Sequence, residues 1–372
     1  CFEKIIPLIK NIRAGYITKS SKEFFSSEVN DILENGIRTA ELYFQKNPTE
    51  ANKAVVFEWL EYNKALTLLE NSNDREARNF GSIPKEILDE ERDLKVEIAY
   101  YEKQLYNSIA LKNEDKEARS RAVLFEKREK FEKLTSELEN KYPKYAAAKH
   151  EIEPITLADL EIALDEKTLL VEYEIIDSDK KKELFITAVQ NHKTDLLKFE
   201  IEEDFEQKLS DYYYLIQQFT IARISNRKRF IELNNYFYQK LIQPIENQLI
   251  GKENLVFVND EILWYLPFET LFSEPDINDF NEFNYLLRNY KITYQYSATL
   301  YFKQLASEPK AYDDNRLFAF APVFKENSTA FMPESEGNRS ADAENPVFRG
   351  DGFKPLLGSE AEVRTIQNLF SE

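Results

Sequence analysis

The sequence predicts an α + α/β protein in which helices fill the first part of the chain and an α/β domain fills the rest. Apolar residues recur at three- and four-residue spacing up to about residue 142, as amphipathic helices require. Beyond about residue 155 they gather in short β-branched and aromatic runs separated by helical segments, which is typical of an α/β sheet. The 372 residues include only 8 glycines, which argues against a β-sandwich or a disordered chain.

Residues 1–80 are predicted to be helices. One amphipathic pattern runs through this region at helical spacing: Phe24, Phe25, Val29, Ile32, Leu33, Ile37 and Ala40. Pro48 lacks an amide proton and breaks the pattern, and Thr49 can cap the helix that follows. Paired helices of about 34 residues indicate TPR units, but the period is not cleanly repeated. We therefore predict only that residues 1–80 are TPR-like.

Residues 81–150 are predicted to be a long antiparallel helical hairpin with coiled-coil seams. A charged break from Lys112 to Arg121 separates its two helices. The first seam is Ile87, Leu94, Ile98, Tyr101, Leu105 and Ile109, and the second is Leu124, Phe131, Leu134 and Leu138. The hairpin is either a lever that binds a partner or a structural element, and the structural interpretation is the simpler one.

The α/β part is predicted to begin with a hairpin of two strands, 168–176 and 184–189. A helical stretch follows over 205–249, and further strands are expected at 254–259, 292–296 and 317–321. Short apolar strands separated by helices predict a mostly parallel sheet. Residues 360–370 are predicted to start a helix, and the polar residues 325–353 a surface loop.

The charge balance argues against a nucleic-acid partner. The formal net charge is −18, the wrong sign for binding phosphates. One local basic group exists, Arg223, Arg227, Lys228 and Arg229, and we interpret it as the solvated face of a helix. No apolar run of about 18 residues predicts a membrane span. A single cysteine fits a reducing compartment, so we expect a cytoplasmic protein.

Few residues qualify as candidates for catalysis or ligand binding. No GxGxxG, GK[ST], CxxC or HExxH motif is present. Cys1, His150 and His192 are the chain's cysteine and histidines, and no pair of them suits a nucleophile and its base. The group Asp177, Asp179 and Glu183 is too poorly spaced for a calcium loop. The sequence therefore predicts no catalytic, cofactor-binding or metal-binding residue and no cofactor.

An ordered set of segments in the second half resembles the CHAT domain, a caspase-like domain often attached to TPR arrays. These segments are Leu241–Ile245 (LIQPI), Gly251–Asp260, Ile262–Leu271 (ILWYLPFETL), Tyr285–Leu287, Ile292–Leu300, Phe318–Val323 and Leu356–Val363. Upstream, Tyr142–Tyr145, Ile155–Leu157 and Leu169–Tyr173 also fit what precedes this domain in TPR-CHAT proteins. The resemblance covers about residues 60–372.

The resemblance implies a caspase-like α/β fold, with residues 151–316 as the N-terminal half of the CHAT domain and 317–372 as the start of the catalytic subdomain. In this segment order Leu255–Val258 is expected to be a central strand, with Leu266, Pro267 and Phe268 packed on the sheet edge. Glu360 and Glu362 are expected to suit a helix N-terminus rather than form a catalytic dyad.

The resemblance also implies a function. CHAT peptidases carry their histidine in a His-Gly element and their cysteine in an Ala-Cys-Glu element, and the 372 residues contain neither. Without these elements we expect the chain to be inactive by itself. It has no initiator Met, so we expect it to be part of a longer protein, and the resemblance suggests a bacterial origin. The parent is then a cysteine endopeptidase regulated by a protein partner on its helical region. The alternative is a non-catalytic TPR/CHAT scaffold.

Overall fold

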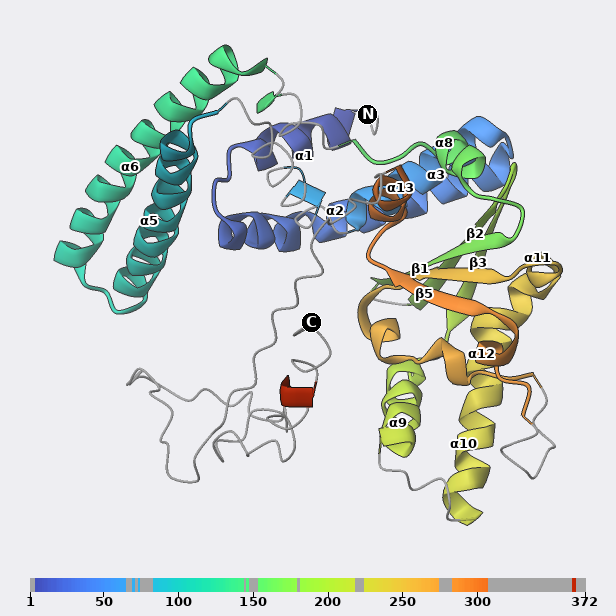
Figure 1. Ribbon diagram of the computed structural model, residues 1–372. Helices are drawn as coiled ribbons and strands as arrows, with labels where there is room; N and C mark the ends of the chain where they lie inside the picture. The colour runs from blue at the N-terminus through green and yellow to red at the C-terminus, as the bar shows by residue number, and fades with distance from the viewer. Residues whose placement is uncertain are drawn as a thin grey trace. The chain divides into compact units, whose positions relative to one another are not determined.

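A computed structural model describes residues 4–64, 69–70, 73, 83–143, 145–146, 153–178, 181–217, 224–273, 283–306 and 363–365 (Figure 1). The chain divides into two compact units, Cys1–Ser307 and Glu308–Glu372. In the second unit the described residues 363–365 are helical, in agreement with the helix predicted there. The strand predicted at 317–321 and the loop predicted at 325–353 lie outside the described residues.

Three helices, α1 (Ile5–Ala14), α2 (Lys19–Lys46) and α3 (Glu50–Asn63), open the chain. Thr18 caps α2 by accepting a hydrogen bond from the backbone N–H of Ser21, whose hydroxyl in turn accepts from the backbone N–H of Thr18. Thr49 caps α3, as predicted, and its hydroxyl lies 3.2 Å from the backbone nitrogen of Asn52. Both caps satisfy amide groups that lack partners in the first turn of a helix.

Helices α2 and α3 pack together at a point where only glycine fits. A Cβ atom added to Gly36 would lie 2.2 Å from the ring of Trp59. Around this contact Phe25, Leu33 and Ile37 of α2 are buried. The predicted apolar face of α2 was too broad, because Phe24 is 61% exposed and Ile32 is 45% exposed.

The predicted helical hairpin is confirmed as α5 (Lys85–Ala110) and α6 (Glu114–Lys141), which pack against each other. Most of the predicted seam lies in one cluster of Leu94, Ile98, Leu124 and Phe131, with Tyr101, Leu105 and Leu134 packed beside it. Ile87 and Leu138 lie instead in a second cluster with Ile83 and Tyr145. Ile109 departs from the predicted seam and is 48% exposed at the end of α5.

A mixed sheet of five strands forms the centre of the first unit, in the order β3-β2-β1-β4-β5. Its strands are β1 (Thr168–Ser178), β2 (Lys181–Gln190), β3 (Lys193–Ile201), β4 (Asn254–Val258) and β5 (Lys291–Gln295). The predicted β1–β2 hairpin is confirmed, and β4 lies between β1 and β5 as the central strand expected.

The prediction of a mostly parallel sheet is corrected, because two of the four strand pairs are antiparallel. β1 and β4 are parallel, as are β4 and β5, whereas β1–β2 and β2–β3 are antiparallel. Sequence reasoning missed β3, which follows β2 through a turn at Asn191 and His192. His192 has φ 57°, a left-handed conformation in which histidine is enriched among the non-glycine residues.

One face of the sheet is covered by the segment between β3 and β4. It comprises α9 (Phe205–Gln217), α10 (Ile224–Phe237), a π-helical turn (Tyr238–Ile242), a 3-10 turn (Gln243–Ile245) and α11 (Glu246–Leu249). The continuous helical stretch predicted here is broken, and Pro244 explains part of the break, because its ring nitrogen cannot donate a hydrogen bond.

The segment between β4 and β5 covers the same face. It contains two 3-10 turns, Glu261–Tyr265 and Phe268–Thr270, and the short helix α12 (Leu286–Asn289). The ring of Phe268 stacks on Phe257 of β4 with a centroid distance of 4.2 Å and on Tyr173 of β1 at 5.4 Å. Phe268 therefore packs on the face of the sheet, which corrects the expectation that it packs on the sheet edge.

The opposite face is covered by α3, α8 (Leu157–Ala163) and α13 (Ala298–Ala306) (Figure 1). Phe57 of α3 and Ala298 of α13 share a buried cluster with Leu170 of β1 and Val256 of β4. The N-terminal helices are thus a layer of the α/β unit. Whether residues 1–80 are TPR-like stays a prediction.

Candidate functional site

Charged side chains gather on the face of the sheet that α3 covers. Successive residues of a strand point to opposite faces. In β1, Val171, Tyr173 and Ile175 enter the large apolar cluster beneath α9 and α10, so Glu172 and Glu174 point the other way. Both glutamates are buried, which is unusual for carboxylates unless they are paired.

Lys64, the residue that ends α3, is the cation of this group. Its ammonium donates to the backbone carbonyl of Tyr173 at 2.9 Å and forms an ion pair with the carboxylate of Glu174. The amide nitrogen of Asn63 donates to the other oxygen of Glu174 at 2.6 Å. After β4, the carboxylate of Asp260 accepts a hydrogen bond of 3.0 Å from the backbone N–H of Ile175.

Glu61, one helical turn before Lys64, binds the start of α13. Its two carboxylate oxygens accept hydrogen bonds of 2.8 Å each from the backbone N–H groups of Ala298 and Thr299. The hydroxyl of Thr299 also donates to Glu61, at 2.5 Å. A carboxylate at a helix N-terminus is stabilised by amide groups that lack partners and by the helix dipole.

Burial controls the ionisation of these groups. It raises the pKa of Glu172 well above 4.5, and the neighbouring carboxylate of Glu61 adds to the effect. Burial also raises the pKa of Glu61, and that of Glu174 to about 7, against the pull of Lys64. For Lys64, burial opposes the charged form, but Glu174 and Asp260 outweigh it and raise the pKa. The cluster therefore holds a charged lysine beside three glutamates whose pKa values burial raises.

Glu172 is distinctive within the cluster. It is 1% exposed, and neither of its carboxylate oxygens has a hydrogen-bond partner. A buried carboxylate without a partner is costly, whereas its neutral form costs much less. Both observations favour the neutral form of Glu172 over its ionised form. We call Glu61, Lys64, Glu172, Glu174 and Asp260 the polar cluster.

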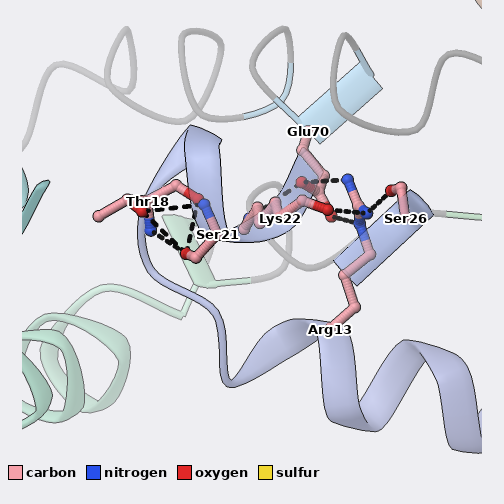
Figure 2. A network of polar contacts seen from close by, with 6 residues as sticks. All are labelled: Arg13, Thr18, Ser21, Lys22, Ser26 and Glu70. Atoms are coloured by element: carbon pink, nitrogen blue, oxygen red, sulfur yellow. Dashed lines mark hydrogen bonds and ion pairs between the residues drawn. The ribbon is translucent and has the colours of Figure 1, made fainter. Parts of the chain in front are cut away.

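A second buried network joins α1 to α2 (Figure 2). The guanidinium of Arg13 donates to the carboxylate of Glu70 at 2.7 and 3.3 Å and to the hydroxyl of Ser26 at 2.5 Å. Lys22 lies 2.9 Å from the same carboxylate. Nearby, the hydroxyl of Thr18 donates to Glu102 of α5 at 2.5 Å, which ties the helical hairpin to the start of α2.

The side chains of these clusters hold elements of the fold in position. Among the described residues, no group of three or more His, Cys, Asp or Glu side chains could hold a metal ion. The polar cluster contains no thiol or imidazole, so nucleophilic catalysis by a cysteine and histidine pair has no residues there. Its carboxylates and ammonium instead cross-link α3, β1, the end of β4 and α13.

The structure places one of the three residues considered for nucleophilic chemistry. His192 is exposed in the β2–β3 turn, as expected. Cys1 and His150 lie outside the described residues. In the basic group, Lys228 and Arg229 are exposed, as predicted, and Arg229 pairs with Asp211 at 3.1 Å. Arg227 is half-buried, and Arg223 lies outside the described residues. Asp177 contacts Lys182 and Glu183 contacts Arg38, whereas Asp179, Glu360 and Glu362 lie outside the described residues.

Comparison with known families shows what the second half of the chain is related to. Residues 231–372 match the family model of the CHAT domain. The chain carries a CHAT domain. No curated protein sequence matches the chain. The match begins within α10 and includes β4, β5 and α13, so it covers the segments that carry the resemblance from Leu241 onward.

The sheet that contains β4 and β5 extends beyond the matched residues. β1, β2 and β3 precede residue 231, yet β1 pairs with β4 over residues 168–172 and 254–258. CHAT domains occur in caspase-like peptidases and in scaffolds related to them, and residues 231–372 match this domain. In the part of the chain that the structure describes, no helix is long and apolar enough to cross a membrane.

Sequence reasoning missed the polar cluster, although a signal was present. Glu172 and Glu174 alternate with apolar residues in a strand, a pattern that normally indicates a solvated face. Glu61 lies among aromatic and apolar residues in the segment Phe57–Tyr62. Charged residues on a strand face and on an apolar helix would have suggested a buried pairing only if α3 had been expected to cover the sheet.

Proposed function

We propose that this chain is part of a caspase-like cysteine endopeptidase of bacterial, cytoplasmic origin, whose peptidase activity is controlled by a protein partner. The observation that carries the proposal is the CHAT domain match over residues 231–372. The α/β sheet supports it, because β4 and β5 are parallel strands of the type on which caspase-like peptidases are built.

The partner is proposed to bind the helices before the sheet. The hairpin of α5 and α6 presents large exposed side chains, among them Tyr106, Leu111 and Phe125. Exposed aromatic residues are enriched at protein interfaces. The net charge of −18 disfavours nucleic acid as that partner, so the partner is a protein.

A non-catalytic scaffold is the second candidate. It requires that the complete protein lack the His-Gly and Ala-Cys-Glu elements, neither of which occurs within the 372 residues. In a scaffold, the CHAT domain would contribute an assembly surface and the helices would bind the same protein partner.

The gene that encodes this chain separates the two candidates. The peptidase proposal expects codons after residue 372 for a His-Gly element and then an Ala-Cys-Glu element. The full gene product should cleave peptides from a fluorogenic panel, and alkylation of thiols should abolish the cleavage. A gene product that lacks both elements and cleaves no peptide would establish the scaffold instead. The 372-residue chain alone is expected to cleave none.

A further inference from the structure

The end of α3 meets three segments that are far apart in the sequence. Lys64 contacts β1, and Glu61 contacts the first residues of α13, 237 positions away. The third segment enters through Thr299, whose hydroxyl accepts a hydrogen bond of 3.0 Å from the backbone N–H of Ile155, just before α8. The last turn of α3 therefore holds β1, α13 and the segment before α8 together.

α13 already has a local cap, so Glu61 is an additional anchor. The hydroxyl of Ser297 accepts a hydrogen bond of 3.1 Å from the backbone N–H of Leu300, as an ordinary N-cap residue does. Glu61 accepts the two N–H groups at Ala298 and Thr299 that Ser297 leaves free. A helix that only needed capping could use water for these groups, because most helices begin at the surface. Here the acceptor comes from another helix and is buried.

The position of Glu61 is itself set by the N-terminal helices. Trp59 lies two residues before it and fills the space left by Gly36 of α2. Ile37 of α2 is fully buried in the same cluster as Trp59. On the other side, the ion pair of Lys64 with Glu174 holds the last turn of α3 on β1. Movement of the α2–α3 pair would thus shift the carboxylate that α13 depends on.

We propose that Glu61 is a positioning residue that transmits displacement of the α2–α3 pair to α13, the last described helix before the chain enters residues 308–372. Because α13 itself lies within the CHAT match, the relay links the helical region to the CHAT domain. The idea that this coupling regulates a peptidase rests on the proposed function. The coupling itself is a property of the chain and needs no peptidase activity.

Hydrogen exchange of the purified 372-residue chain tests the coupling. Glu61→Gln removes the charge and replaces one acceptor by an NH₂ group that faces a backbone N–H. We expect amide exchange in α13 to accelerate at least tenfold, while the β1–β2 hairpin exchanges as in the wild type. Glu58→Gln, an exposed site on the same helix, should leave α13 unchanged. Equal acceleration in α13 and β1–β2, or none in α13, would overturn the proposal.

A double-mutant comparison distinguishes transmission from simple capping. Ile37→Val loosens the packing of α2 on α3, and it should accelerate exchange in α13 when Glu61 is present. In the Glu61→Gln background the same change should have no further effect on α13, because the link is already broken. Additive effects would contradict the relay. If Glu61→Gln does not fold, Thr299→Val removes the hydroxyl bridge and is measured in its place. These exchange measurements do not depend on peptidase activity. A full gene product that cleaves no peptide would contradict the proposed function and leave the coupling intact.

Discussion

The two faces of the sheet hold their covering layers by different means. Against α9 and α10 the face is apolar and aromatic, with Tyr173, Phe257, Phe268 and Tyr294 packed ring against ring. Against α3 and α13 it carries the polar cluster among a smaller set of apolar side chains. Apolar packing is strong but not directional, whereas buried ion pairs and hydrogen bonds fix geometry at a cost in desolvation. The first face therefore supplies stability, and the second sets position.

The largest expected effect lies on the aromatic face. Phe268→Ala removes a fully buried ring that stacks on Phe257 and Tyr173. The free energy of unfolding should fall by about 4 kcal/mol, as for other buried aromatic truncations. Urea denaturation measures it. Phe125→Ala, at an exposed site on α6, is the control and should change stability by less than about 0.5 kcal/mol.

The next effect comes from breaking the ion pair on the polar face. Lys64→Met leaves the carboxylate of Glu174 buried without its cation and should destabilise the fold by about 3 kcal/mol. The double variant Lys64→Met/Glu174→Leu removes both charges and should recover much of this loss, again measured by urea denaturation. Lys130→Met breaks an exposed pair with Glu126 and should cost less than about 0.5 kcal/mol. A double variant no more stable than Lys64→Met would argue against pairing as the cause.

The contact between α2 and α3 gives a smaller effect. Gly36→Ala places a Cβ atom 2.2 Å from the Trp59 ring, so the helices must separate or Trp59 must change rotamer. Overpacking of this kind should cost about 2 kcal/mol, even though alanine favours the helix. Gly15→Ala is the matched control, because its nearest contact is 3.3 Å away. Thermal unfolding of the two variants should separate them clearly, and equal melting temperatures would show that α2 and α3 do not touch there.

The smallest effect concerns the protonation of Glu172, which faces Glu61 and Lys64 of α3, Glu174 of its own strand and Asp260 after β4. Its folded pKa is raised above 4.5, so the folded state keeps a proton that the unfolded state loses as the pH rises. The wild type should therefore lose stability above about pH 4.5 relative to Glu172→Gln, which mimics the neutral acid. The difference in free energy of unfolding between the two proteins should therefore be larger at pH 7 than at pH 4. Urea melts at pH 4 and pH 7 measure it, and a difference that shrinks with pH would show that Glu172 is ionised.

Much of the fold could be predicted from the sequence because its periodicity is strong. The seam residues Leu94, Ile98, Leu124 and Phe131 and the apolar strand Leu255–Val258 form the elements that their spacing indicates. β3 could not be predicted in this way, since Lys193–Ile201 is only half-buried and its pattern is weak. The polar cluster could not be predicted because it depends on α3 covering the sheet, a contact between residues more than 100 positions apart.

The measurement that tests the difference between the two faces most directly is hydrogen exchange of Glu61→Gln beside Phe268→Leu. Phe268→Leu weakens the aromatic face, so exchange should accelerate together in α13 and in the slowest amides of β1 and β4, as global opening becomes easier. Glu61→Gln should accelerate exchange in α13 while β1 and β4 remain protected. The same pattern of exchange in both variants would contradict the account, because the polar face would then contribute stability alone and would not set the position of α13.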